Sequence, residues 1–582
     1  MTEHADIIED ALDIAIPASD GLVLDDTRRL TGPGLLWDHP GAVLDVLFRD
    51  HAPDTVMANW HEEARRVMDA IGWSDQSITT RAYDGGVSLA ISAPLDQLYS
   101  ATFVAQTAWH FCAAKLLNVD TSGFDTMVAD LTSVMAREAN PRLINILQHA
   151  EARGVGFLVD DDTLSLGYGK NSQSWPVLDL PEPGTINWSG LADIPVAVIT
   201  GTNGKTTTTR LACAIARAAG RTAGLTSTDM VSVGDDVLDR GDYSGPGGAR
   251  LLLRDPRLEI GYLEVARGGI LRRGLPLTHA RAALVTNVAA DHLGQYGINT
   301  VEDLATAKLA VHRALGAQGH LVLNADDPLI VAEAARINID VIWFSLDPEN
   351  PNITEARATN QPCGWLDNTT LILFDGAQGQ TILDVADIPI TMNGAARYNV
   401  RNALGAACLS QAMEIGIDAI RNGLRNFQND PKDNPGRCNE FAVNGARVFV
   451  DFAHNPHSIE AVTSAMRAIP AKRRFVMLSH AGDRSDQDIA EVTASALAMQ
   501  PDFLIASELS DHLRGRNEGD VTRLIVKAAR AHGMTDDQVL HATSPADGAA
   551  QILTHLQDGD LALLLVLSER DAIFEMLERQ AG

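Results

Sequence analysis

The sequence has few cysteines, and none of them lie close together. Only five occur in 582 residues, namely Cys112, Cys213, Cys363, Cys408 and Cys438, and no two form a Cys-x-x-Cys pair. This spacing excludes a disulfide-rich secreted scaffold and indicates a reducing compartment. We therefore predict that each thiol is a small buried hydrophobic group.

Long apolar stretches are also missing. No segment reaches the roughly 18 uninterrupted apolar residues that a membrane-spanning helix requires. The first six residues, Met-Thr-Glu-His-Ala-Asp, are acidic and lack the apolar stretch of a signal peptide. We expect a cytoplasmic protein with no membrane partner.

Positive charge is scarce. The chain has 46 Lys and Arg residues against 76 Asp and Glu residues, which gives a formal net charge of −30. A field of this sign repels phosphate, so it argues against nucleic acid or an anionic membrane as a partner. Any phosphate site must be a local exception built from glycine, lysine and metal.

What is present indicates a globular protein of several domains, because a chain of this length is too long for one core. We predict an α+β domain at 1–150, a proline-rich linker at 151–190, and α/β domains at 191–432 and 433–582. Apolar strands alternate with helical patterns after residue 190, which is typical of mainly parallel sheets covered by helices. The fold class is therefore multidomain α/β, with a Rossmann-like C-terminal domain.

The stretch Val196–Arg210 carries the strongest chemical signal. Four apolar or β-branched residues predict a short buried strand, and Gly201-Thr-Asn-Gly-Lys-Thr-Thr207 follows it. Glycines allow a turn whose N–H groups face an anion, Lys205 supplies charge for the β- and γ-phosphates, and the Thr206 hydroxyl suits Mg²⁺. Only two residues separate the glycines, whereas the usual phosphate loop has four. We predict a nucleoside triphosphate site in the central domain.

Two later strands end in residues that suit the same site. Glu264 ends the strand Gly261–Val265, and the pair Asp291 and His292 follows the strand Ala282–Val285. Open α/β sheets bind ligands at the carboxyl ends of their strands. Taken singly, Glu264 is also compatible with a solvated carboxylate and His292 with a structural histidine. A histidine is an unusual Mg²⁺ ligand, so the metal site needs further support.

That support comes from a resemblance. The ordered set of the phosphate loop, Glu264, Asn287 to His292, Lys308, Asn399 to Asn402, Arg437 and Asp451 to Pro456 resembles the Mur ligase superfamily. Stretches such as Leu263-Glu-Val-Ala-Arg-Gly-Gly-Ile-Leu271 are more similar to the C-terminal half of the cyanophycin synthetases. The similarity covers about residues 190–582.

The resemblance implies ATP and Mg²⁺ as cofactors and assigns roles to matching residues. Lys205, Glu264, His292 and Lys308 would be catalytic, with Thr206 and Glu264 on one Mg²⁺, His292 on a second, and Lys308 carbamylated and able to bind metal. Without the resemblance, Lys308 is compatible with an exposed lysine on the helix predicted at 301–315. The nucleotide would contact the following residues: Gly201, Thr202, Asn203, Gly204, Lys205, Thr206, Thr207, Asn287, Asn399, Asn402, Arg437, Asp451 and His454.

The substrate would meet Asn455 and two arginines. Arg514 and Arg516 follow the strand Asp502–Ala506 in one of few basic clusters, where related ligases bind the incoming amino acid. A solvated basic loop is the alternative. The chain departs from the cyanophycin synthetases by lacking their ATP-grasp body, which extends the aspartate backbone there. The resemblance therefore implies only the second type of step, the attachment of arginine to aspartate side chains.

We predict an ATP-dependent carboxylate–amine ligase that acts through an acyl phosphate and joins an amino acid such as arginine or lysine to an acidic carboxylate. One alternative is a nucleotide-binding partner that regulates or scaffolds a separate ATP-grasp ligase. Another is a folylpolyglutamate-type ligase. The expected partners are amino-acid or peptide substrates, possible contact with that separate ligase, and a second copy of the chain in a dimer.

Overall fold

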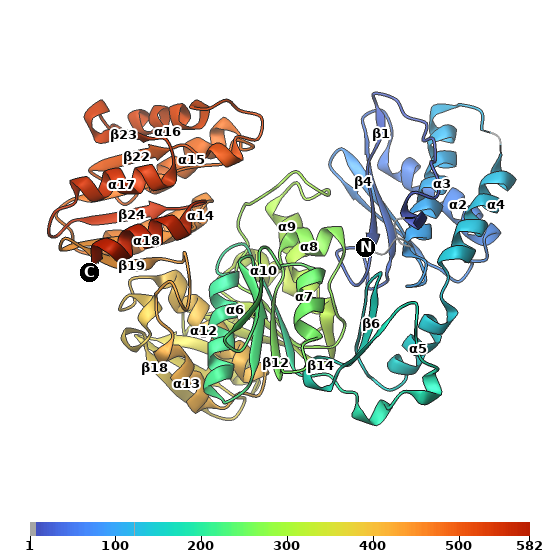
Figure 1. Cartoon of the computed structure of the whole chain (residues 1–582), viewed down its shortest axis with the longest axis horizontal. Helices are drawn as coiled ribbons and strands as arrows, with labels where there is room; N and C mark the ends of the chain where they lie inside the picture. Colours follow the sequence, from blue (N-terminus) through green and yellow to red (C-terminus); the bar gives the residue numbers. More distant parts are fainter. Residues whose placement is uncertain (1–6, 122, 582) are drawn as a thin grey trace. The chain divides into compact units, whose positions relative to one another are not determined.

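A computed structural model describes residues 7–121 and 123–581 of the chain, and the six N-terminal residues used above lie outside that range. The chain forms two compact units. The first comprises Met1–Val288, His292–Phe344 and Ala407–Gly416, and the second comprises Ala289–Asp291, Ser345–Ala406 and Ile417–Gly582. Figure 1 shows their elements in sequence colours.

The first unit begins with an antiparallel sheet of order β1-β2-β4-β3. Helix α3 packs against β1 and β2, and α2 packs against α3 and β4 (Figure 1). Strand β4 is buried along its whole length, and Trp60 of α2 and Trp109 of α3 are completely buried. These elements are β1 (Leu22–Leu30), β2 (Gly41–Phe48), α2 (Pro53–Ala70), β3 (Ile78–Tyr83), β4 (Gly86–Ser92), α3 (Leu98–Leu117) and α4 (Phe124–Glu138).

Residues 141–190 follow with α5 (Pro141–Glu151) and a small antiparallel sheet of β5 (Phe157–Val159), β6 (Thr163–Leu166) and β7 (Gln173–Pro176). Leu143, Ile146, Leu164 and Leu166 form part of a hydrophobic cluster beneath it. The domain boundaries drawn from the sequence remain predictions.

The centre of the first unit is a sheet of order β11-β10-β9-β12-β8-β13-β14-β15, in which β9, β12, β8, β13, β14 and β15 are parallel. Its middle strands are continuous apolar runs because helices cover both faces. Its strands are β8 (Val196–Thr200), β9 (Ala223–Thr226), β10 (Met230–Val233), β11 (Asp236–Arg240), β12 (Ile260–Glu264), β13 (Ala280–Val285), β14 (Leu315–Asn324) and β15 (Val341–Ser345). Its helices are α6 (Lys205–Ala218), α7 (Pro246–Leu253), α8 (Arg267–Arg272), α9 (Val301–Leu309) and α10 (Pro328–Ala334).

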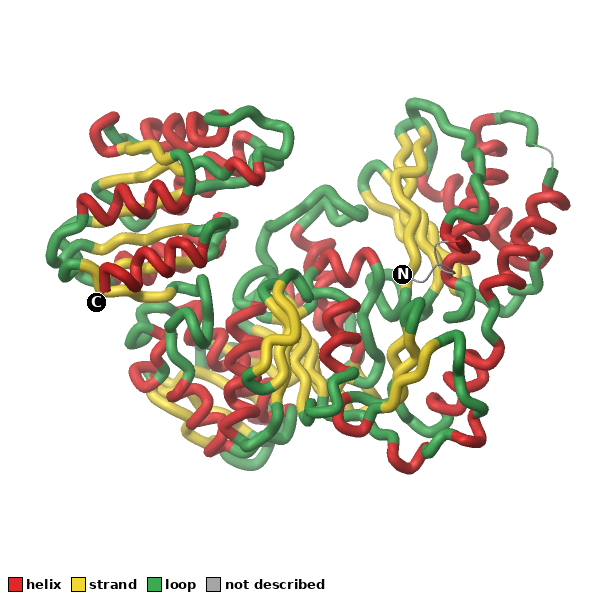
Figure 2. The backbone as a smooth tube through the Cα atoms, viewed as in Figure 1, coloured by secondary structure: helices red, strands yellow, loops and turns green. Residues whose placement is uncertain are grey.

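The second unit contains an antiparallel meander and a six-stranded sheet of order β19-β20-β24-β21-β22-β23. In the six-stranded sheet only β19 is antiparallel to its neighbour. Helices α14, α15 and α16 contribute to one hydrophobic cluster, while α17 and α18 contribute to another. Figure 2 shows the helices and strands of the chain coloured by type.

The elements before this sheet are α11 (Pro351–Ala358), β16 (Cys363–Asp367), β17 (Thr370–Phe374), β18 (Gly379–Asp384), α12 (Arg397–Ala412) and α13 (Ile417–Asn426). Its strands are β19 (Asn439–Val443), β20 (Ala446–Asp451), β21 (Arg474–Leu478), β22 (Phe503–Ser507), β23 (Val539–Ala542) and β24 (Leu561–Leu565). Its helices are α14 (Pro456–Ala468), α15 (Asp486–Leu497), α16 (Asp520–Ala531), α17 (Pro545–His555) and α18 (Arg570–Ala581).

These sheets confirm the predicted multidomain α/β fold class. All five cysteines are buried, as their scattered positions predicted. None of the helices within residues 7–121 and 123–581 is both long and apolar enough to cross a membrane.

Candidate active site

The phosphate loop joins β8 directly to α6, as the sequence predicted. Strand β8 ends at Thr200, and α6 begins at Lys205. Gly201 has φ +144° and Gly204 has φ +82°, conformations that residues with a side chain rarely adopt. A Cβ atom on Gly201 would lie 1.9 Å from the Thr286 hydroxyl oxygen. The first glycine is therefore required both by its backbone angle and by the neighbouring strand end.

Asn287 holds the loop from the adjacent strand end. Its side-chain oxygen accepts from the Asn203 amide at 3.0 Å, and its Nδ2 donates to the Asn203 carbonyl at 2.9 Å. Its backbone carbonyl accepts from the Thr202 amide at 2.8 Å. The Thr286 hydroxyl adds a 2.6 Å bond to the Asn203 carbonyl. The sequence assigned Asn287 to this site but missed Thr286, whose signal is a hydroxyl directly after the apolar strand β13.

The cationic end of the loop is Lys205, the first residue of α6. Its Nζ donates to the Thr202 carbonyl at 2.9 Å, so the side chain folds back over the loop. Thr206 and Thr207 follow it and are buried. The backbone N–H groups at the start of a helix favour an anion, and the Lys205 ammonium strengthens that preference.

Glu264 lies at the end of β12, which runs parallel to β8. It pairs in register with Ile199, one residue before the end of β8, and its side chain is only 1% exposed. The Thr200 hydroxyl donates to the Val265 carbonyl at 2.7 Å and holds the two strand ends together. The Glu264 carboxylate and the Thr206 hydroxyl supply the oxygen ligands that Mg²⁺ prefers, so these residues fit such an ion.

Lys308 reaches the same loop from α9. A capping box between Thr300 and Asp303 sets the start of that helix. The Lys308 side chain is 4% exposed, and its Nζ donates to the Gly201 carbonyl at 2.8 Å. This excludes the alternative of an exposed helix lysine. The structure therefore brings Lys205, Glu264, Asn287 and Lys308 to one edge of the central sheet.

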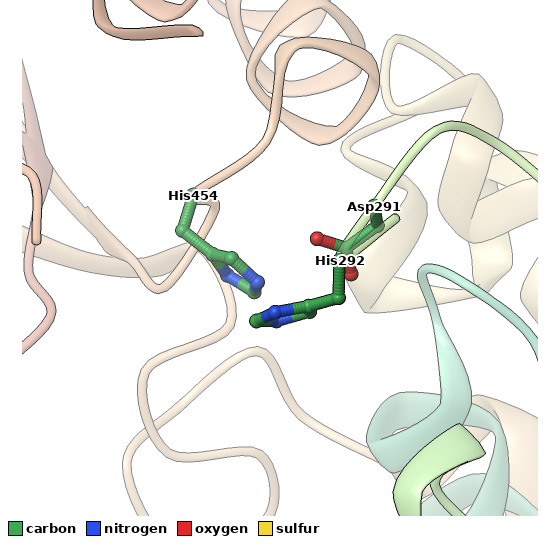
Figure 3. A group of neighbouring side chains, drawn as sticks. All are labelled: Asp291, His292 and His454. Carbon is green, nitrogen blue, oxygen red and sulfur yellow. The ribbon is translucent and has the colours of Figure 1, made fainter. Parts of the chain in front are cut away.

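His292 follows this edge in a loop and is exposed, with a left-handed backbone at φ +51°. The Arg267 guanidinium donates to its carbonyl, and also to the Gln295 side chain at 2.7 Å. Figure 3 shows the side chains of Asp291, His292 and His454. Asp291 and His454 belong to the second unit, and their possible ligand atoms lie within 4.8 Å of each other. Within that unit, Asp291, which the sequence analysis paired with His292 after β13, is therefore a candidate metal ligand.

In the second unit, the predicted adenine residues form a buried amide pair. The Asn402 Nδ2 donates to the Asn399 side-chain oxygen at 3.1 Å, and the Asn399 Nδ2 donates to the Ile390 carbonyl at 2.9 Å. Both side chains lie on α12, three residues apart on one face. The geometry explains the spacing of the pair, while its role toward adenine stays a prediction.

Arg437 and Asp451 interact electrostatically in the same unit. Burial raises the pKa of Asp451 to about 6, and the Arg437 charge and backbone N–H groups oppose that shift. The Asp451 carboxylate accepts from the Ala453 amide at 2.7 Å. The Arg437 guanidinium stands 5.0 Å from the Phe452 ring centre. Asp451 is thus a buried carboxylate at the end of β20 rather than a solvated one.

The loop after β20 positions His454 and Asn455. The His454 Nδ1 lies 3.0 Å from the Phe452 carbonyl, and the Asn455 side chain caps α14 by accepting from the Ser458 amide at 2.9 Å. The His480 ring, which is buried, lies 3.2 Å from the His454 carbonyl. The sequence analysis did not identify His480, which lies two residues after the end of the apolar strand β21.

The two predicted substrate arginines hold neighbouring loops together. Arg514 pairs with Asp483 at 2.7 Å. Arg516 donates to the Gly482 carbonyl at 2.9 Å and to the Arg484 carbonyl at 2.7 Å. The structure thus joins the 482–484 loop to the 514–516 loop, while substrate binding by either arginine stays a prediction.

Comparison with known proteins identifies the family of this chain. The "Mur ligase middle domain" model matches residues 199–410, and the "Mur ligase, glutamate ligase domain" model matches residues 436–565. A cyanophycin synthetase of Synechocystis is 37% identical over 416 residues, which is 71% of this chain and 46% of that protein. A UDP-N-acetylmuramate–L-alanine ligase of Xanthomonas axonopodis is 30% identical over 372 residues, which is 63% of this chain and 70% of that protein.

The chain spans about half the length of the cyanophycin synthetases it matches. Among solved structures, a bifunctional folylpolyglutamate synthase/dihydrofolate synthase from Yersinia pestis has a TM-score of 0.47 at 17% identity. That likeness covers 66% of this chain and 89% of the other. From the phosphate loop onward, both family models and the similar relatives lead to one conclusion: this chain belongs to the Mur ligase family.

Proposed function

We propose that this protein is an ATP-dependent ligase that joins a carboxylate to an amine through an acyl phosphate. The observation that carries the proposal is the gathering of Lys205, Glu264 and Lys308 at the carboxyl edge of one parallel sheet, in a chain of the Mur ligase family. A phosphate loop alone suits many nucleotide enzymes. The buried carboxylate and second lysine beside it support phosphoryl transfer with metal assistance.

In this proposal the chain's own residues hold the transferring phosphoryl group. Lys205 and the N–H groups at the start of α6 would counter charge on the β- and γ-phosphates, and Thr206 and Glu264 would hold Mg²⁺. When bound, the metal neutralises charge that develops on the phosphate oxygens. Positioning and electrostatics supply most of the acceleration in such reactions.

The reaction balances in two steps. A carboxylate oxygen of the substrate bonds to the γ-phosphorus, and the bond between that phosphorus and the ADP oxygen breaks. The amine nitrogen then bonds to the acyl carbon, inorganic phosphate leaves and the amine loses a proton. The acyl phosphate must be shielded from water, because hydrolysis would waste ATP.

For the substrates, we propose an amino acid such as arginine or lysine as the amine donor and an aspartyl or other acidic group as the carboxylate. The cyanophycin synthetases among the relatives support this choice. Five buried, unbridged cysteines support the proposal that the enzyme works in the cytoplasm.

The test is ADP release by the full chain over a matrix of amino acids and acidic acceptors, including β-aspartyl peptides, with mass spectrometry of each product. We expect at least one pair to exceed the acceptor-free rate and to give a product heavier by one amide-linked residue. Lys205→Ala is the inactive control. If no pair exceeds background while ATP still binds, the ligase proposal is wrong and a nucleotide-binding regulatory role is favoured.

A further inference from the structure

A large cavity lies in the first unit, apart from the predicted catalytic edge. Its volume is about 970 Å³, which is in the range of small-molecule sites. Its walls come from the N-terminal part of the chain, from the 157–161 segment, and from α7 and the turn between α8 and β13. None of the residues predicted for the nucleotide or metal lines it.

Two arginines in this cavity have no carboxylate partner. Arg250 of α7 and Arg273 after α8 line the wall, and each is partly buried. Within residues 7–121 and 123–581, no Asp or Glu side chain forms an ion pair with either of them. Burial lowers the pKa of both guanidinium groups. The charges of Asp160 and Asp161 only partly oppose this shift at Arg250, and neighbouring arginines add to it at both positions. Partly buried like charges without partners are costly in a protein.

Two carboxylates that line the cavity and act electrostatically on Arg250, Asp160 and Asp161, are already engaged. Asp160 accepts from Arg254 at 2.6 Å. Asp161 accepts from the Tyr99 hydroxyl at 3.0 Å and lies 3.5 Å from Arg29. The carboxylates that best offset Arg250 are thus committed to other groups. An anion that entered the cavity would meet guanidinium groups ready to donate.

Arg254 provides an internal contrast. It lies one helical turn after Arg250, yet its guanidinium makes bonds to Asp160, to the Ser165 hydroxyl and to the Thr163 carbonyl. Such a set of bonds is typical of an arginine that holds structure together. Arg250 makes no such set, although the whole chain carries a large excess of carboxylates.

The other walls restrict the kind of anion. Leu95, Leu158, Leu275 and Leu277 contribute apolar surface, and the volume far exceeds that of a bare inorganic ion. Guanidinium forks match the planar geometry of a carboxylate. We propose that this cavity is a binding site for a small organic carboxylate, up to the size of a short peptide, which Arg250 and Arg273 hold. This site is separate from the catalytic edge and does not depend on the proposed ligase activity.

The first test uses the stability of the ligand-free full chain. We expect Arg250→Gln to raise the melting temperature or leave it unchanged, because it removes a partly buried charge without a partner. Arg254→Gln, the contrasting variant at the C-cap of the same helix, should lower it. If Arg250→Gln lowers the melting temperature as much as Arg254→Gln does, Arg250 is a structural residue and the proposal fails.

The second test measures ligand binding by calorimetry and thermal shift with glutarate, the dipeptide Asp-Ala, inorganic phosphate and sodium chloride at matched ionic strength. We expect saturable binding of at least one carboxylate probe, weakened about tenfold or more in the Arg250→Gln/Arg273→Gln variant. Arg530→Gln, an exposed arginine on α16, is the charge-matched control and should bind normally. Stronger binding of phosphate than of both carboxylates, or no saturable carboxylate binding, would overturn the assignment.

Discussion

Lys205 and Lys308 are two amines that contact the same phosphate loop in different ways. Lys205 folds over the loop to the Thr202 carbonyl, whereas Lys308 approaches from α9 and donates to the Gly201 carbonyl. Lys205 is the residue that we propose to contact phosphate, and Lys308 is a buried amine that donates to the loop backbone. Their substitution should therefore affect catalysis by different routes.

For Lys205→Ala we expect kcat/KM for ATP to fall by about 10²- to 10³-fold, because one preorganised charge facing the transferred phosphate is lost. Steady-state ADP release measures it. Lys527→Ala, an exposed lysine on α16, is the control and should change little. Retention of more than a tenth of the activity by Lys205→Ala would contradict the role.

For Lys308 the prediction concerns a carbamate, which forms when the neutral amine adds CO₂ and releases a proton. We expect Lys308→Met to lower kcat by about a hundredfold without loss of folding, and the wild-type rate to fall in CO₂-depleted buffer and recover with bicarbonate. Circular dichroism checks folding. If the wild-type rate does not depend on bicarbonate, Lys308 is not carbamylated and acts only as a positioning residue.

Asp451 predicts a pH dependence. Its folded pKa is raised to about 6 from an ordinary value of 3.8, so the folded chain holds a proton that the unfolded chain releases between these values. Its contribution to stability is complete below about pH 4 and is lost as the pH rises through 6. Asp451→Asn should abolish this pH-dependent loss. Its free energy of unfolding at pH 7 should therefore exceed that of the wild type by about 2–3 kcal/mol. Melting temperatures of both proteins from pH 4 to 8 test it, and parallel curves would refute it.

At the scale of elements, the phosphate loop is a strand–turn–helix unit that depends on the next strand. Asn287, after β13, both accepts from and donates to Asn203. The turn is therefore held in shape before any nucleotide arrives, and this preorganisation lowers the cost of binding.

This arrangement predicts a graded series. Asn287→Asp keeps the acceptor for the Asn203 amide but loses the donor to its carbonyl, whereas Asn287→Ala loses both. We expect the Kd for ATP to rise about threefold to tenfold in the first variant and more in the second. Calorimetry with Mg²⁺ and a non-hydrolysable ATP analogue measures the order, and equal affinities would show that the loop keeps its shape without Asn287.

The observed bounds of three elements show which kinds of element local sequence patterns can predict. Strand β8 occupies Val196–Thr200, as predicted, because it is a continuous apolar run between clear breakers. The helix expected at 301–315 ends earlier, since α9 stops at Leu309 and a 3₁₀ turn spans Ala310–Ala314. Strand β11, Asp236–Arg240, was missed because it is an exposed edge strand with no apolar run. Edge pairing depends on a neighbouring strand and leaves a weak local pattern.

At the scale of the whole molecule, the net charge of −30 leads us to expect that phosphate binds only where local structure overcomes the repulsion of the acidic chain. We expect Mg²⁺ with ATP to stabilise the native protein by about 2.7 kcal/mol at a concentration one hundred times its Kd, and sheared duplex DNA to have no effect. Thermal shift at constant ionic strength compares the two. If Mg²⁺ with ATP raises the melting temperature of Lys205→Ala as much as that of the wild type, or if DNA raises the wild-type melting temperature, the expected selectivity for ATP is wrong.

The sequence alone determined the strand–turn–helix geometry of the 201–207 loop, the strand ends that carry Glu264 and Asn287, and the family, because each depends on residues close together in the chain or on motifs in a fixed order. Only the tertiary structure decided that Lys308 is buried against the Gly201 carbonyl and that Thr286 lies too close to Gly201 for a side chain there. It also decided that Arg250 and Arg273 line one cavity and form no ion pair with any carboxylate in the part of the chain that the structure describes. These properties arise when distant segments pack, and burial and pairing are set by that packing rather than by local pattern.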